Sequence, residues 1–190
     1  MILAFNKPYG VLSQFNPQVA GQRTLDEFKF PKNVYPIGRL DMDSEGLLLL
    51  SDEGQWSDLL LHPRHGHERT YHVQVEGEIE EAALIELRKG VAIQDWKTRP
   101  CQVSRLSSVN YSERNPPIRF RKSIPTSWME LKLIEGKNRQ VRRMTAAVGF
   151  PTLRLIRVAS GSLKLGDLEP GTWCALSTEQ IRMLLQKPRK

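Results

Sequence analysis

Apolar and polar positions alternate along two stretches of the chain, residues 70–76 and 128–134. A period of two places the apolar side chains on one face, as in a strand that is half buried. Shorter apolar runs predict further strands at 2–5, 34–37, 47–51 and 153–158. Between residues 91 and 135 we expect strands, with a polar interruption containing prolines at 112–117.

Helical spacing appears in segments that are scattered between these strands. We expect helices at 55–61, 79–89 and 138–148, the last two ended by Gly90 and Gly149. Apolar residues three and four apart should give these last two helices a buried face, formed by Ala83, Leu84 and Leu87 in one and by Val141, Met144, Thr145 and Val148 in the other.

The end of the chain carries a capping box, in which Ser177 and Gln180 bracket the first turn of a final helix. Its expected inward residues are Ile181, Leu184 and Leu185. Because strands outnumber helices and do not alternate regularly with them, the pattern favours an α+β fold with a mixed, mostly antiparallel sheet and flanking helices. We expect a single domain with two lobes, about 1–62 with 150–190 and about 63–149.

The composition indicates a globular protein, with 39% apolar and 26% charged residues in a chain of 190. The longest purely apolar run, Leu47 to Leu50, is far shorter than the ~20 residues that cross a membrane. Residues 1–7 have no secretion signal, and the two cysteines make no disulfide framework. We therefore expect a cytoplasmic protein that does not engage a membrane. No coiled coil or other dimer element is visible, so we expect a monomer.

The net charge of +7 is unevenly distributed. Residues 1–96 hold 9 basic and 15 acidic side chains, whereas residues 97–157 hold 14 basic and 3 acidic ones. A strongly basic middle segment suggests a surface that attracts a polyanion such as nucleic acid. A solvated basic face is the simpler alternative.

The densest candidate site is the segment 38–50, in which Asp41, Asp43, Glu45 and Arg39 precede four leucines. Charges at the mouth of a buried strand are typical of active sites, although a polar loop that leads into a core strand would look the same. A calcium loop is a further alternative, because Asp41, Asp43, Glu45, Gly46 and Asp52 match positions 1, 3, 5, 6 and 12 of an EF-hand. Pro36 and Gly38 argue against the helix that should precede such a loop.

The segment 135–144 is the strongest basic element. If it is helical, Arg139, Arg142 and Arg143 share one face beside the apolar stripe. One arginine at the edge of that stripe could turn inward to a carboxylate while the others contact phosphate. Four histidines between residues 62 and 72 allow a zinc site, but no cysteine lies nearby and a surface loop fits better. Nucleotide-binding glycine motifs and GxSxG are absent.

Taken in order, four motifs resemble those of pseudouridine synthases, in the small-subunit-synthase (RsuA) branch. They are Asn6-Lys7-Pro8-Tyr9-Gly10-Val11, Gly38-Arg39-Leu40-Asp41 with the leucine run, Arg69-Thr70-Tyr71-His72-Val73, and Gly136-Lys137-Asn138-Arg139-Gln140-Val141-Arg142-Arg143-Met144. Leu155-Ile156-Arg157 fits the strand that follows. The resemblance covers most of the chain, but the S4-type RNA-binding module that many relatives carry at the N-terminus is not seen ahead of the first motif.

The resemblance implies a pseudouridine synthase fold with a central active-site cleft. It also implies an enzyme that acts on ribosomal RNA of the large subunit without a cofactor or metal. It implies that Asp41 is the nucleophile, that Arg142 is its partner cation and that Tyr71 stacks on the uracil and exchanges a proton. Leu155 would pack on the other side of the ring. Arg39 would fill the place of a flipped-out base, and phosphates would be held by Lys137, Arg139 and Arg143.

Two positions depart from the pattern of the family. Ser44 stands where many relatives have threonine, and Ser160-Gly161 stands where an Ile-Gly pair is usual. A non-catalytic RNA-binding or ribosome-assembly protein on the same fold is the competing hypothesis, because the basic segment would serve it equally well.

Overall fold

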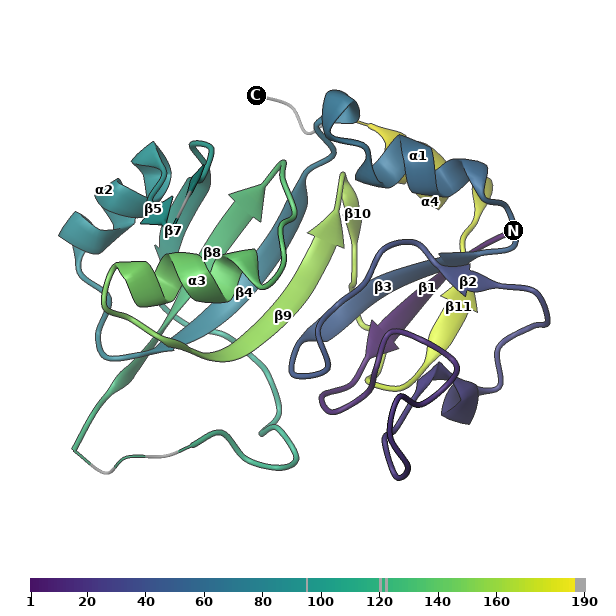
Figure 1. The fold of residues 1–190 in the computed structure, drawn as a ribbon, viewed down its shortest axis with the longest axis horizontal. Coiled ribbons are helices and arrows are strands. Elements are labelled where there is room, and N and C mark those ends of the chain that lie inside the picture. Colours follow the sequence, from purple (N-terminus) through teal and green to yellow (C-terminus); the bar gives the residue numbers. More distant parts are fainter. Residues whose placement is uncertain (95, 120, 122, 187–190) are drawn as a thin grey trace. The chain divides into compact units, whose positions relative to one another are not determined.

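The computed structural model describes residues 1–94, 96–119, 121 and 123–186. The chain divides into two compact units, Met1–Arg69 with Ile156–Lys190 (unit 1) and Thr70–Leu155 (unit 2). Both boundaries fall inside strands that Figure 1 labels β4 (Arg69–Glu76) and β9 (Thr152–Ser160). The chain therefore enters and leaves unit 2 along extended backbone.

A sheet of mainly antiparallel strands forms the frame of unit 1. Its strands, with the unit 1 part of β9, are β1 (Ile2–Lys7), β2 (Tyr35–Pro36), β3 (Glu45–Ser51), β10 (Leu163–Lys164) and β11 (Trp173–Ala175). The strand β1 lies between β11 and β3 and is antiparallel to both. The parallel pair joins β3 to β9, with Glu45 opposite Ile156.

Every residue of β1 and β3 is buried, which indicates that both faces of these strands are covered. One cluster contains Leu47, Leu49 and residues of α1 (Gln55–Leu61) and α4 (Thr178–Leu185). Elsewhere Phe5 contacts the rings of Phe28 and Phe30, at centroid distances of 4.8 and 5.1 Å. Short 3-10 helices lie at Leu25–Phe28 and Pro63–His65.

Unit 2 has a sheet with one face against two helices. Its elements are β4, β5 (Ala92–Ile93), β6 (Trp96–Lys97), β7 (Gln102–Leu106), β8 (Thr126–Leu133), α2 (Glu81–Lys89) and α3 (Gln140–Ala147). The strand β8 lies between β4 and β7, while β5 and β6 form a separate hairpin. Burial alternates along β8, so its buried side chains join those of α2 and α3 in one cluster.

The predicted α+β class with a mostly antiparallel sheet is confirmed. The helix α1 has the predicted bounds, and both predicted hydrogen bonds of the Ser177 capping box are present. The predicted inward position of Leu185 is wrong, because its side chain is 48% exposed whereas Leu184 is fully buried. The predicted helix at 138–148 begins only at Gln140.

Candidate active site

The loop that carries Asp41 is fixed by hydrogen bonds on both sides of this residue. The Leu40 N–H donates to Ser13 Oγ at 3.1 Å, and the Ser13 hydroxyl donates to the Leu40 carbonyl at 2.8 Å. The Ser44 N–H donates to the Asp41 carbonyl at 3.0 Å, which closes a turn immediately before β3. Asp41 is half-buried in this loop, whereas Arg39 is exposed.

Lys7 ties this loop to the first motif. Its side chain is 0% exposed, and Nζ donates to the carbonyls of Val11 at 2.6 Å, Pro8 at 2.9 Å and, more weakly, Met42 at 3.4 Å. The Gly10 N–H also donates to the Met42 carbonyl, at 2.8 Å. Burial lowers the pKa of Lys7 from 10.5 to about 7, opposed by the carboxylates of Glu45, Asp43 and Asp41.

Gly46 allows β3 and β9 to approach closely next to the Asp41 loop. Its φ is +98°, and a Cβ there would lie 2.3 Å from the Arg157 carbonyl oxygen. The buried Arg157 side chain donates from Nε to the Leu47 carbonyl at 2.6 Å. Gly46, which directly precedes the leucine run, is therefore required by backbone packing.

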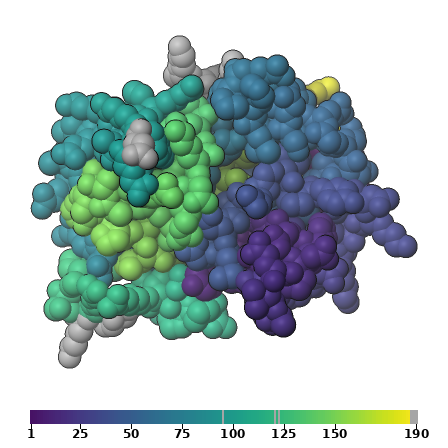
Figure 2. All heavy atoms as spheres, viewed as in Figure 1, coloured from purple at the N-terminus to yellow at the C-terminus, as the bar shows by residue number. Residues whose placement is uncertain are grey.

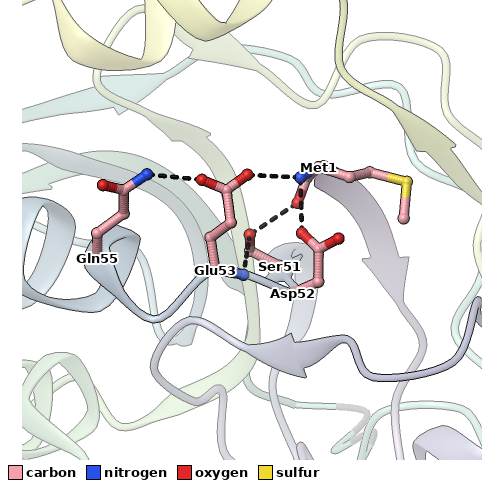
Figure 3. A network of polar contacts seen from close by, with 5 residues as sticks. All are labelled: Met1, Ser51, Asp52, Glu53 and Gln55. Carbon is pink, nitrogen blue, oxygen red and sulfur yellow. Dashed lines mark hydrogen bonds and ion pairs between the residues drawn. The ribbon is translucent and has the colours of Figure 1, made fainter.

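The calcium-loop alternative is wrong. The segment that would be the second half of that loop is the buried strand β3, Glu45–Ser51. The carboxylate of Asp52, which would be the last ligand, instead pairs with the Met1 ammonium at 2.6 Å, as Figure 3 shows. Glu53 contacts the same ammonium at 2.7 Å.

The histidines do not gather into a zinc site. His65 Nε2 contacts Arg64 Nε at 3.0 Å, and His72 Nδ1 contacts the Tyr111 hydroxyl at 2.6 Å. Within the parts of the chain that the structure describes, no three His, Cys, Asp or Glu side chains are grouped to hold a metal ion. His67 bonds through Nε2 to Ser160 Oγ at 2.9 Å, so the unusual serine has a polar partner. Burial, with the positive charges of Arg69 and Arg157, lowers the pKa of His67 to about 4.

In unit 2, Tyr71 and Leu155 belong to the same apolar surroundings. Leu155 is 5% exposed and lies in one cluster with Val141 and Met144 of α3. The half-buried Tyr71 ring packs against that cluster from β4. The tyrosine, the leucine and the helix that carries Arg142 are therefore brought together within this unit.

The three arginines of the basic motif do not share a helix face as predicted. Arg139 is the N-cap of α3 and has a left-handed φ of 50°, so it stands outside the helical register. Arg142 is half-buried and Arg143 is exposed. The sequence pattern missed this because it started the helix two residues too early, before the left-handed turn.

The turn before α3 is organised by the buried side chain of Gln140. Its Nε2 donates to Glu135 Oε1 at 2.5 Å, and its Oε1 accepts the Lys137 N–H at 2.9 Å. The Lys137 ammonium lies 3.9 Å from the centre of the Trp96 ring.

The sequence pattern did not predict a role for Trp96, Lys7 or Ser13. Of these three residues, only Lys7 lies in a recognisable motif. Of the predicted site residues, Asp41 and Arg39 lie in unit 1 and the others in unit 2.

The sequence and fold define an RNA-modifying isomerase. The family model described as RNA pseudouridylate synthase matches residues 1–147, and the chain belongs to this family. A solved structure, "Crystal structure of pseudouridylate synthase", is similar with a TM-score of 0.80 and 28% identity, covering 96% of this chain and 73% of that one. The predicted family and fold are confirmed, and the protein is an RNA pseudouridine synthase.

Two curated relatives indicate which pseudouridine synthases this chain resembles. The ribosomal large subunit pseudouridine synthase E of Xanthomonas campestris pv. campestris is 52% identical over 96% of this chain and 98% of its own length. The ribosomal large subunit pseudouridine synthase B of Bacillus subtilis is 34% identical over 94% of this chain and 68% of its own length. Among these enzymes, the motifs of the sequence also predict a particular resemblance to synthase E, and this comparison confirms it. No helix among the described residues has the length and apolar character to span a membrane.

Proposed function

We propose that this enzyme converts one uridine of large-subunit (23S) ribosomal RNA to pseudouridine, with Asp41 as the nucleophile, a flipped-out target base and no cofactor. The substrate is supported by the names of its relatives, which include a 52% identical large-subunit synthase. The role of Asp41 is supported by one structural observation. The backbone on both sides of this carboxylate is fixed by bonds to Ser13 and by the turn to Ser44. A catalytic group needs such a fixed position.

The reaction is a rearrangement that consumes no second substrate. The bond between uracil N1 and ribose C1′ breaks, the uracil rotates, and a bond forms between C5 and C1′. C5 loses its proton and N1 gains one, so no oxidant or energy source is needed. A carboxylate such as Asp41 could attack C1′, attack C6 or assist elimination through the 2′-proton, and the same side chain serves each route.

Unit 2 supplies the remaining roles in this proposal. Tyr71 stacks on the uracil and its hydroxyl exchanges a proton, while Leu155 packs against the other side of the ring. Arg142 keeps the Asp41 carboxylate ionised in surroundings with little water. Their support is the family resemblance and the shared apolar cluster that holds Tyr71, Leu155 and α3.

The RNA backbone is held by Lys137, Arg139 and Arg143, and Arg39 fills the stack that the target base leaves. All four side chains are exposed and can therefore reach a bound RNA. A base inside a stacked RNA cannot reach a fixed carboxylate, so flipping is part of the proposal. Binding should weaken steeply with salt, because each phosphate contact releases counterions.

The decisive experiment measures tritium release to water from uridine-5-tritiated ribosomal RNA that lacks its natural modifications. Large-subunit and small-subunit RNA are tested separately with the parent protein, with Asp41→Asn and with Asp167→Asn. Asp167 is an exposed carboxylate of unit 1 outside the motifs, so its variant is the matched control.

We expect release from large-subunit RNA by the parent and by Asp167→Asn, and none by Asp41→Asn, which should still bind the RNA. Release by Asp41→Asn at the parent rate would show that Asp41 is not the nucleophile. Release from small-subunit RNA alone would overturn the proposed substrate. If the parent binds RNA but releases no tritium from either, the binding-protein hypothesis is favoured.

A further inference from the structure

A basic and aromatic surface of unit 2 is centred on the contact between Trp96 and Lys137, with the exposed Lys97 and Arg99 close by in the chain. Of these four residues, only Lys137 has a role in the proposed function. We refer to the four together as the Trp96 surface. Trp96 and Lys97 form β6 of the short hairpin, and Lys137 belongs to the turn before α3. In Figure 2 the teal atoms of the hairpin region and the green atoms of the α3 region border one another on the visible face.

The hairpin holds Trp96 in a defined position. Trp96 is paired with Ile93, and the base of the hairpin is closed by two bonds between Val91 and Thr98. The Val91 N–H donates to Thr98 Oγ1 and the Thr98 N–H donates to the Val91 carbonyl, each at 2.9 Å. The ring packs against the apolar core cluster of unit 2. A rigid aromatic ring at the edge of a core offers a stacking face at little entropic cost.

The cations on this surface are not engaged with the acidic side chains that the structure describes. Lys97, Arg99 and Lys137 form no ion pair with any described residue. The nearby Glu135 carboxylate already accepts from the Arg99 N–H at 2.8 Å and from Gln140 Nε2 at 2.5 Å. Lys137 instead places its ammonium 3.9 Å from the centre of the Trp96 ring. This surface thus combines an aromatic ring with cations that no acidic side chain among the described residues neutralises.

We propose that Trp96 is the platform on which a nucleobase of the single-stranded RNA substrate stacks, after Lys137 leaves the ring for a phosphate. The inference rests on the proposed function, in which Lys137 holds phosphate of an RNA substrate. The exchange is favourable, because a base stacked on an aromatic ring contributes more binding free energy than an exposed cation–π contact does. The occupant is a nucleotide because this surface offers both a ring for the base and cations for the backbone.

The test compares Trp96→Leu, which keeps apolar contact with the core but has no aromatic face, with Trp96→Phe, which keeps both. The dissociation constant for a large-subunit RNA fragment is measured for each variant at several salt concentrations. We expect Trp96→Leu to bind about tenfold more weakly and Trp96→Phe to stay within about threefold of the parent. The salt slope should be unchanged in both, whereas Lys137→Met should make it less steep by about 0.7–0.9.

Two results would overturn the proposal. One is a dissociation constant for Trp96→Leu within twofold of the parent. The other is a salt slope that is less steep in Trp96→Leu, together with no further weakening of RNA binding when Lys137→Met is added to that variant. In that case Trp96 would act only by positioning Lys137. If Trp96→Leu does not fold, tryptophan fluorescence decides: quenching by RNA that is lost in Trp96→Phe supports stacking, and undiminished quenching contradicts it.

The failure of this inference is distinguishable from failure of the proposed function. The parent is first tested for tritium release from large-subunit RNA. An active parent with unchanged binding in Trp96→Leu refutes the stacking role alone. An inactive parent refutes the proposed function, and stacking is then judged by the fluorescence difference on the RNA that the protein does bind.

Discussion

Lys7 should make the stability of this enzyme rise between neutral and alkaline pH. Its side chain is fully buried, and its pKa falls from 10.5 to about 7. Between these values the unfolded chain binds a proton that the folded protein does not, so the free energy of unfolding increases by about 1.4 kcal/mol per pH unit. Below pH 7 both states are protonated, and the buried charge costs the folded state about 5 kcal/mol relative to the neutral amine.

The assay is urea denaturation of the parent, of Lys7→Met and of Lys32→Met, where Lys32 is an exposed lysine of unit 1. From pH 7.5 to 9.5 the parent should gain about 2.5 kcal/mol relative to Lys7→Met. Lys32→Met should follow the parent. Parallel curves for the parent and Lys7→Met would refute the reasoning, because the three carbonyls around Nζ would then hold the ammonium at its ordinary pKa.

Three further outcomes are expected. Gly46→Ala should lower the free energy of unfolding by at least about 3 kcal/mol in urea melts, because its Cβ would meet the Arg157 carbonyl at 2.3 Å, whereas Gly54→Ala, with nothing within 4 Å, should change it little. From pH 7 to 4.5 the free energy of unfolding of the parent should fall by about 2 kcal/mol relative to that of His67→Gln. In this range the imidazole is protonated in the unfolded chain, with its ordinary pKa of 6.5, but mostly not in the folded protein, where the pKa is about 4. Equal losses in the two proteins would contradict this. Arg143→Ala should make the slope of log affinity against log salt less steep by about 0.7–0.9 in RNA titrations, and an unchanged slope would remove Arg143 from the phosphate contacts.

Local patterns were sufficient for the regular elements. The alternation along β8 and the spacing of Ala83, Leu84 and Leu87 predicted the buried faces, because each signal depends on a few neighbouring residues. The capping box at Ser177 was likewise predictable from four residues. Leu185 was misplaced because helical spacing does not show how wide the buried face of α4 is: Leu184 is fully buried, whereas Leu185 is 48% exposed.

The geometry of the site depended on contacts that no local pattern contains. Lys7 is buried because carbonyls from its own turn and from Met42, far along the chain, accept its protons. Ser13 fixes Leu40 from 27 residues away. Arg139 takes a left-handed conformation that arginine rarely adopts, so helical spacing placed it on the wrong surface. The family motifs contain Lys7 and Arg139, but the contacts of these residues could be read only from the folded structure.

Unit 1 is made of two segments that are far apart in the sequence, and this affects the order in which the enzyme folds during its synthesis. The strand β3 needs β9 as its parallel neighbour, and Arg157 reaches Leu47 across 110 residues of sequence. Chains emerge N-terminus first, and unit 2 lies wholly between these two partners. The loop of Asp41 therefore acquires its neighbouring strand only after all of unit 2 has left the ribosome. A nascent chain that ends before Ile156 should therefore be inactive, even when it already contains every motif residue through Arg143.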